Sequence, residues 1–241
     1  MTADLQGKYD AAFYANQKAG SRTSAGLVIE KLAPVLGNVS SVLDVGCGAG
    51  GWLQAVREVY PKATVFGVDH PAVPRSEMFI NEDAFAGYDL SEPIDLERSF
   101  DLVITLEVAE HIPPEKAETF LETLTRHGDV VLFSAAIPRQ GGTGHVNEQW
   151  PEYWIDLMAA RDYKALDIVR PLIWNDDAIA SWYKQNMLLF AKSPEKLQVA
   201  GAEDWAGRAM IHPGSWVRAT EPLPTKISRV LSGRKPDHAW R

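Results

Sequence analysis

Four side chains that could bind a metal ion or move a proton lie in two short stretches of the sequence. Glu107, Glu110 and His111 are spaced i, i+3 and i+4, so they share one face if the chain turns helical there. His145 lies in a glycine-rich stretch, residues 135–149, whose length is typical of a functional loop. Carboxylates with one or two imidazoles suit a divalent ion such as Mg²⁺. Without a metal, His111, His145 and Glu110 are candidates for acid–base catalysis, or they only brace the loop.

A glycine-rich turn predicts a nucleotide-type cofactor site. Gly46, Gly48 and Gly51 follow a short apolar run and precede a helical pattern, as in G-x-G-x-x-G loops. Asp44, two residues before the first glycine, would oppose the pyrophosphate of a dinucleotide but favour the cationic ammonium and sulfonium of S-adenosylmethionine. Asp69, 21 residues after Gly48, can accept hydrogen bonds from both ribose hydroxyls of either cofactor. The alternative is that both aspartates are ordinary turn residues.

The elements that must position these residues alternate between short β-rich runs and amphipathic helices. This alternation predicts an α/β fold with a mainly parallel sheet. Helices are expected at 24–36, at 51–60, after Pro114 and after Pro151. The predicted strands are 41–45, 64–69, 85–88, 100–106, 129–134, 163–169 and 186–192. Because parallel strands end at a common sheet edge, the glycine turn and both acidic stretches should open on one side.

Four segments resemble motifs of the class I S-adenosylmethionine-dependent methyltransferases: VLDVGCGAGGW, VFGVD, GYDLSEP and FDLVITLEVAEHI. The resemblance covers about residues 24–192. It implies a Rossmann-like sheet of seven strands, mostly parallel with the last strand antiparallel, and helices on both faces. It also implies that S-adenosylmethionine is the cofactor.

The same resemblance assigns roles to individual residues. Asp44, Gly46 and Gly48 would line the methionine end of the cofactor, and Asp69 would hold its ribose. The remaining residues that it implies for the cofactor are Asp89 and Leu90 beside the adenine, with Asp83 as a rival, and Leu106 and Glu107 as the floor.

The expected reaction follows from the E-x-x-E-H spacing. That spacing is similar to ubiquinone-pathway O-methyltransferases and small-RNA 2′-O-methyltransferases, which implies a metal held by Glu107, Glu110, His111 and His145. An alcohol is a poor nucleophile until its proton is taken, and a bound metal lowers the pKa of a hydroxyl group. A hydroxyl of a small molecule or glycan is therefore the expected acceptor. Alternatives are N-methylation of an amino sugar or other small amine, an NAD-dependent oxidoreductase, and a catalytically idle cofactor-binding subunit.

Composition and motifs exclude several classes of protein. The chain of 241 residues carries a net charge of −8, which would repel a nucleic acid. It also has LEVAEH at the position where DNA amino-methyltransferases carry an NPPY-type tetrapeptide, so no nucleic-acid partner is expected. Its one cysteine, Cys47, allows no internal disulfide, and no apolar run could span a membrane. A cytoplasmic location is therefore expected.

The chain is expected to have three parts. Residues 1–23 would form a helix that covers the cofactor as a lid or packs on the core. Residues 24–192 would form the catalytic domain. Residues 193–241 lose all periodicity and would form an appendage that wraps the core, covers a site or meets a partner chain, such as a second copy in a homo-oligomer.

Overall fold

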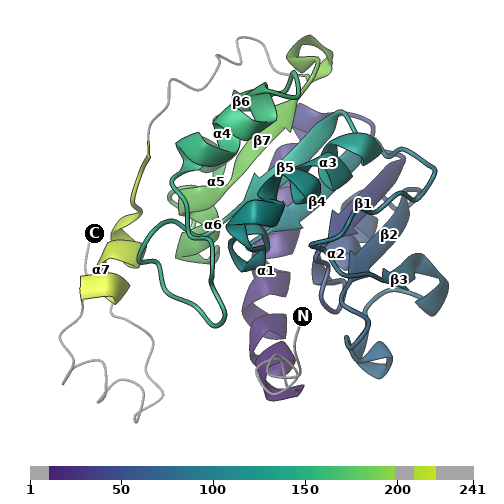
Figure 1. Ribbon diagram of the computed structural model, residues 1–241, viewed down its shortest axis with the longest axis horizontal. Helices are drawn as coiled ribbons and strands as arrows, with labels where there is room; N and C mark the ends of the chain where they lie inside the picture. Colours follow the sequence, from purple (N-terminus) through teal and green to yellow (C-terminus); the bar gives the residue numbers. More distant parts are fainter. Residues whose placement is uncertain (1–10, 199–208, 221–241) are drawn as a thin grey trace.

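A seven-stranded sheet forms the centre of the computed structural model, which describes residues 11–198 and 209–220 (Figure 1). Its strand order is β3-β2-β1-β4-β5-β7-β6, and β7 runs antiparallel to both of its neighbours. The predicted fold class is therefore confirmed. The strands are β1 Ser41–Val45, β2 Thr64–Asp69, β3 Phe85–Gly87, β4 Leu102–Leu106, β5 Val130–Ser134, β6 Lys164–Leu166 and β7 Leu188–Ala191.

Helices cover both faces of the sheet because successive strand residues point to opposite sides. Val42 of β1, for example, packs with α1, α2 and α5, whereas the next residue, Leu43, packs with α3 and α4. Figure 1 shows α7 beyond α6, away from the sheet. The helices are α1 Ala11–Leu36, α2 Gly51–Val59, α3 Ala117–His127, α4 Pro151–Ala159, α5 Val169–Ile173, α6 Ser181–Asn186 and α7 Pro213–Thr220.

The boundaries differ most from the expected ones at two places. The first helix begins at Ala11 instead of residue 24, so the expected division at residue 23 falls inside one continuous helix. The sixth strand is confined to Lys164–Leu166, because the chain turns into α5 at Val169. Residues 1–10, 199–208 and 221–241 of the expected terminal parts lie outside the described residues. Within the described part, no helix combines the length and the apolar character that crossing a membrane requires.

The chain reverses its direction of winding between β1 and β4, which are adjacent in the sheet. Beyond β1 the strands continue to one side as β2 and β3, and beyond β4 they continue to the other side as β5. In open α/β sheets, ligands bind outside the carboxyl ends of the strands at such a point. The glycine turn follows β1 and Glu107 follows β4, so the topology brings the two predicted motifs together.

Candidate active site

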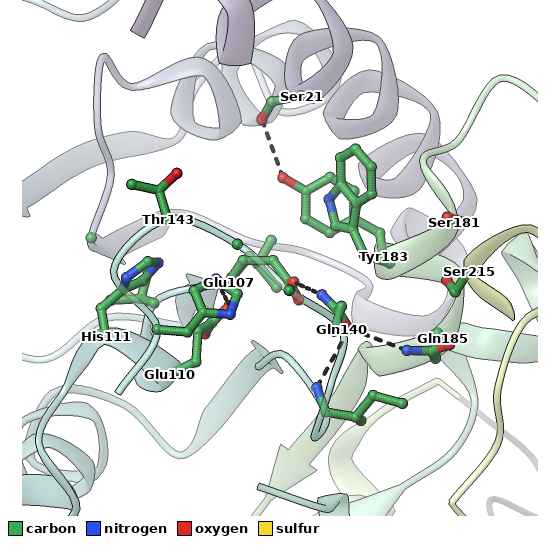
Figure 2. Close-up of a pocket in the computed structure, with 18 of the residues that line it drawn as sticks. Ser21, Glu107, Glu110, His111, Gln140, Thr143, Ser181, Tyr183, Gln185 and Ser215 are labelled. Atoms are coloured by element: carbon green, nitrogen blue, oxygen red, sulfur yellow. Dashed lines mark hydrogen bonds and ion pairs between the residues drawn. The ribbon is translucent and has the colours of Figure 1, made fainter. Parts of the chain in front are cut away.

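One large cavity of about 1130 Å³ opens at this sheet edge (Figure 2). Its walls come mainly from five parts of the chain. They are the glycine turn with the start of α2, residues 106–111 after β4, the loop 137–145 after β5, α6, and residues 211–220. Ser21 and Arg22 of α1 also line it, and the Ser21 Oγ lies 3.3 Å from the Tyr183 Oη of α6.

The glycine turn is held by backbone geometry and by one aspartate. Gly46 has φ 86°, and a Cβ at this position would overlap the Val108 side chain, so only glycine fits. Its amide donates to the Val68 carbonyl (2.8 Å). The Asp69 Oδ2 accepts from the Gly48 amide at 2.7 Å, and its Oδ1 accepts from the amide of the next residue at 2.6 Å. Asp69 therefore holds the backbone of the turn through these hydrogen bonds, and it is not among the residues that line the cavity.

Asp44 lies behind the glycine turn and is 2% exposed. Its Oδ2 atom has no hydrogen-bond partner among the described residues. The pKa of Asp44 is raised well above its ordinary value, mainly by burial and to a smaller extent by the negative charge of Asp69. A cation close to the turn would oppose both effects, so this buried carboxyl fits a positively charged ligand group.

The residues expected beside the adenine lie after β3, away from the cavity lining. The Asp89 Oδ1 accepts from the Ser91 hydroxyl (2.7 Å) and amide (3.0 Å), and this hydroxyl bond holds the pKa of Asp89 below its ordinary value. Leu90 packs against the core on the α3 side. Asp83, the rival, is exposed in a 3₁₀ turn, Glu82–Ala84.

Glu107 does not share a helical face with Glu110 and His111, so that expectation is wrong. Its φ of 56° turns the chain sharply after β4, and Glu110 and His111 then lie in a 3₁₀ turn, Ala109–His111, instead of an α-helix. Its Oε2 accepts from the Gln140 side-chain amide (2.8 Å), and its Oε1 accepts from the Asn186 amide (3.1 Å). Burial raises the pKa of Glu107, and these bonds oppose that shift.

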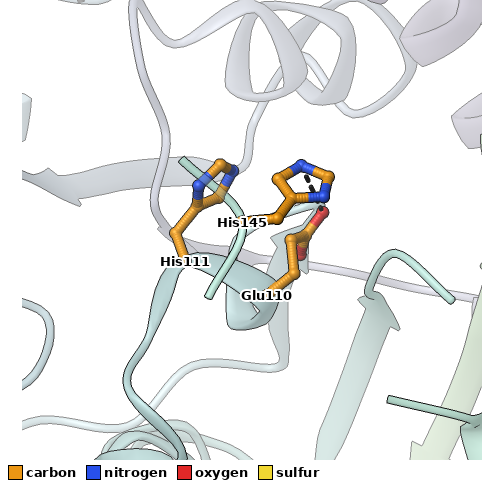
Figure 3. Close-up of side chains that lie close together, drawn as sticks. All are labelled: Glu110, His111 and His145. Carbon is orange, nitrogen blue, oxygen red and sulfur yellow. Dashed lines mark ion pairs between the residues drawn. The ribbon is translucent and has the colours of Figure 1, made fainter. Parts of the chain in front are cut away.

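The structure brings Glu110, His111 and His145 together (Figure 3). Their candidate ligand atoms lie within 4.8 Å of one another, and the two imidazole rings meet edge to face with centroids 4.9 Å apart. The His145 Nε2 lies 3.9 Å from the Glu110 Oε1. Glu107, the fourth expected ligand, is not part of this group.

Burial controls the protonation of this cluster. Glu110 is completely buried, and neither of its carboxylate oxygens has a hydrogen-bond partner among the described residues. Its pKa is raised well above the ordinary value, first by burial and then by the charge of Glu107. The pKa of His111 is lowered to about 4, mainly by burial and to a smaller extent by repulsion from a charged His145. His111 is therefore a neutral imidazole at neutral pH.

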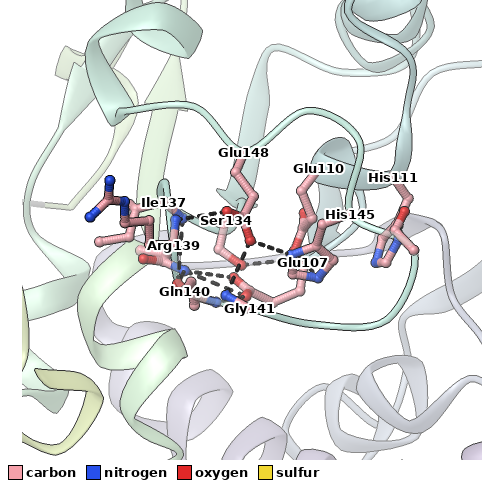
Figure 4. Close-up of polar contacts among 12 residues, drawn as sticks. Glu107, Glu110, His111, Ser134, Ile137, Arg139, Gln140, Gly141, His145 and Glu148 are labelled. Carbon is pink, nitrogen blue, oxygen red and sulfur yellow. Dashed lines mark hydrogen bonds and ion pairs between the residues drawn. The ribbon is translucent and has the colours of Figure 1, made fainter. Parts of the chain in front are cut away.

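Glu148 is a structural residue of the site that the sequence did not reveal (Figure 4). Its carboxylate accepts from the His145 Nδ1 (2.8 Å) and from the backbone amides of Arg139 (2.7 Å) and Gly141 (3.1 Å). Burial alone would raise the pKa of Glu148, but these bonds outweigh it and lower the pKa. One carboxylate thus folds the loop and orients the His145 ring. The only signal in the sequence was its i+3 spacing from His145.

The far wall of the cavity is joined to Glu107 through amide side chains. The Gln185 Nε2 of α6 donates to the Gln140 Oε1 (3.1 Å), and the Gln185 Oε1 accepts from the His212 backbone amide (3.0 Å). The His212 Nε2 lies 3.1 Å from the Trp174 carbonyl, and its ring meets the Trp174 ring edge to face. The expected appendage therefore includes a helix, α7, that is attached to the site and lines it.

Comparison with known proteins identifies the family and the fold. Residues 19–169 match the family model of a methyltransferase domain, and no curated protein sequence matches the chain. Magnesium protoporphyrin IX methyltransferase from Synechocystis PCC 6803 with bound SAM has a TM-score of 0.53 and 19% identity over 77% of this chain and 86% of its own. The plantazolicin methyltransferase BpumL in complex with SAH and a monoazolic desmethylPZN analog has a TM-score of 0.55 and 15% identity over 78% and 90%.

The chain spans only about half the length of a third structure, human N-acetylserotonin methyltransferase in complex with SAM. That match covers 75% of this chain and 54% of the human chain, at 18% identity and a TM-score of 0.49. The family match covers well over half of this chain, from α1 to the start of α5. The chain therefore belongs to the methyltransferase-domain family, and its fold is that of the S-adenosylmethionine-dependent methyltransferases.

Proposed function

We propose that this protein transfers the methyl group of S-adenosylmethionine to a hydroxyl group of a small molecule or glycan. The observation that supports the proposal is that one cavity joins the glycine turn to the Glu110–His111–His145 cluster. The first part suits the methyl donor, and the second suits removal of a proton from the acceptor. The family match favours this reaction over hydride transfer to or from NAD.

The donor would bind at the glycine turn. Gly46 and Gly48 allow the cofactor to approach the backbone closely, with the buried Asp44 carboxyl favouring its positive charges. Asp69 would hold the ribose, but its oxygens now accept from the Gly48 and His70 amides, so it would share them with the ribose hydroxyls. Asp89 and Leu90 would flank the adenine, and Leu106 and Glu107 would form the floor of the cavity.

His145 is the proposed general base. Its Nδ1 lies 2.8 Å from Glu148, so the Nδ1–H donates to that carboxylate and the Nε2 can accept a proton. The acceptor hydroxyl would give its proton to this Nε2 as its oxygen attacks the sulfonium methyl group, and the methyl–sulfur bond breaks with the electron pair staying on sulfur. The Glu148 carboxylate, 2.8 Å from the His145 Nδ1, would stabilise the resulting imidazolium.

A divalent ion such as Mg²⁺ fits the same cluster. The Glu110 oxygens are buried and have no hydrogen-bond partner in the described part of the chain. The Nδ1 of His111 faces the Gly144 carbonyl and the Nδ1 of His145 faces Glu148, and such partners usually orient a histidine whose other ring nitrogen binds a metal. When bound, such an ion would lower the pKa of the acceptor hydroxyl. We propose Glu110, His111 and His145 as its ligands in that case, with the ion in place of the His145 Nε2 as the group that activates the hydroxyl. Glu107 would not take part, because its oxygens accept from Gln140 and Asn186.

The test begins with calorimetry of the full chain with S-adenosylmethionine and with NAD. Tight S-adenosylmethionine binding and no NAD binding are expected. Methyl transfer to a panel of alcohols, phenols, sugars and amines is then followed by mass spectrometry, with and without excess chelator. Methylation of amines alone would show N-methylation, and binding without turnover of any acceptor would show an idle subunit. Full activity in chelator would exclude the metal and leave His145 as the base.

A further inference from the structure

Large apolar side chains that are exposed to water gather around the mouth of the cavity. Among the described residues, five such side chains are exposed by more than two fifths, and three of them line the cavity: Trp150, Ile211 and Trp216. Trp216, on α7, is 58% exposed. Apolar surface gathered beside a site usually marks where a ligand or partner covers it. Here it continues directly into the cavity that contains His145.

Among the side chains that the structure describes, the cavity-lining residues of α6 and of residues 211–220 carry no charge. The polar groups that these residues contribute are mostly hydroxyls, with the side-chain amide of Gln185. Two of the hydroxyl residues, Ser181 and Ser215, lie close together in Figure 2. The charged and titratable lining residues, such as His111 and Glu110, come from other segments. The described lining residues of α6 and of residues 211–220 therefore offer a ligand neither a cation for a phosphate or carboxylate nor a carboxylate for an ammonium, and the lining cations Arg22 and Arg139 belong to α1 and to the loop after β5.

The amides on this side of the cavity are already used. The Gln185 Nε2 donates to Gln140 and to Asn186, and its Oε1 accepts from the His212 amide. The Gln140 Oε1 accepts from both neighbouring amides, and its Nε2 donates to Glu107. Sugar rings are held by several hydrogen bonds to such groups, and breaking this network to provide them would leave the buried Glu107 without its donors.

We propose that the acceptor is a neutral, planar, mainly apolar ring compound with a hydroxyl group, and that Trp216 of α7 forms the wall against which its ring packs. This inference rests on the proposed function and narrows its acceptor to a phenol-like compound. The cavity of about 1130 Å³ exceeds the roughly 300–1,000 Å³ of a pocket for one small ligand, so it has room for donor and acceptor together. The ring would lie by α7, with its hydroxyl toward His145.

The position of α7 supports a fixed wall. His212, at the base of the helix, is tied to the Trp174 carbonyl and to Gln185, and a Cβ on Gly214 would lie 3.3 Å from the Ser181 Cβ. The start of α7 therefore packs directly on the start of α6. Residues 209–220, within the expected appendage, thus cover the site in this proposal.

The test measures binding of two probes to the full chain by calorimetry, in saturating S-adenosylhomocysteine. The probes are 7-hydroxycoumarin, a planar phenol, and methyl α-D-glucopyranoside, a sugar of similar size. The phenol should bind, and the sugar should bind at least about ten-fold more weakly. Trp216→Ala should weaken phenol binding about ten-fold, and Trp216→Phe should restore most of it because a flat ring is retained. Val217→Ala, on the same helix but outside the cavity lining, should leave binding unchanged.

Several outcomes would overturn the inference. They are sugar binding equal to or tighter than phenol binding, no phenol binding at millimolar concentration, and equal effects of Trp216→Ala and Val217→Ala. S-adenosylmethionine affinity is measured on the same samples. If the donor binds but the phenol does not, only this inference fails. If the donor itself does not bind, the proposed function fails as well.

Discussion

The two ends of the cavity are constructed in different ways. The donor end is a short backbone turn between β1 and α2, held by backbone amides and the carboxylate of Asp69, which ends β2. The acceptor end is assembled from side chains that are distant in sequence. Glu107 bonds to Gln140 and Asn186, which are 33 and 79 positions away, and Gln185 connects this network to α7.

This difference indicates what each end tolerates. A backbone turn with left-handed φ angles depends on the absence of side chains, so substitutions there should disturb both folding and donor binding. A network of side chains over a folded sheet can lose one member while the chain remains folded. Substitutions at the acceptor end should therefore change turnover more than stability. Each of the following predictions tests one side of this comparison.

The largest effect is expected for His145→Ala. Loss of the proposed base should lower kcat about 100- to 10,000-fold, while the Kd for S-adenosylmethionine changes less than about two-fold. Single-turnover kinetics and calorimetry measure the two quantities separately. Parallel losses of kcat and donor affinity would show that the two ends are not independent.

At the donor end, Gly46→Ala should destabilise the protein by about 2–4 kcal/mol and remove donor binding. The alanine would be strained at φ 86° and would overlap the Val108 side chain. Urea unfolding measures the loss. Gly26→Ala is the matched control, because the space around Gly26 in the middle of α1 is open and alanine favours a helix. It should stabilise the protein by about 0.5–1 kcal/mol.

Replacing Glu148 by glutamine should lower kcat by about 10- to 100-fold, since second-layer partners of a histidine commonly have effects of this size. The variant keeps the shape of the side chain but weakens the acceptor for the His145 Nδ1–H. The pH profile of kcat should shift as well, because the imidazolium loses a stabilising charge. Asp156→Asn, an exposed change on α4, is the control and should alter neither. An unchanged pH profile would limit Glu148 to a role in folding the loop.

Glu110→Gln should stabilise the ligand-free protein at pH 8, because the amide cannot ionise in its buried position. The raised pKa means that the folded state keeps the Glu110 proton at pH values where the unfolded chain has lost it. Wild-type stability from this group therefore falls as pH rises through the raised pKa, and the neutral variant avoids that loss. The gain should shrink as pH falls. Glu118→Gln, whose side chain is 73% exposed, should show no such trend in urea unfolding.

The smallest effect on stability is expected from ending the chain at residue 198. Leu197 is buried in the core and the Gln198 amide donates to the Val35 carbonyl, so the core contacts made by residues 194–198 would be retained. We expect a folded protein with unchanged S-adenosylmethionine affinity and weakened acceptor binding. Thermal unfolding and calorimetry would show this. Global unfolding of the truncated chain would place α7 in the core instead.

Most of the donor end could be predicted from the sequence, because it depends on local patterns. Apolar runs of strand length define the sheet, and the spacing of Gly46, Gly48 and Asp69 follows from one β–α–β unit. The pairing of Glu110 and His111 with His145 also followed, because neighbouring parallel strands end at the same edge. The cofactor roles of all the residues expected to bind the donor stay predictions: Asp44, Gly46, Gly48, Asp69, Asp89, Leu90, Leu106 and Glu107.

Only the tertiary structure decided the acceptor end. The left-handed φ at Glu107 separates this carboxylate from Glu110, although their spacing alone predicts one helical face. The role of Glu148 depends on how the loop folds back, and α7 lines the cavity only because His212 bonds to Trp174 and Gln185. These contacts join side chains across long stretches of chain. Sequence periodicity reports which face of an element is buried, but it carries no information on which distant polar groups will meet.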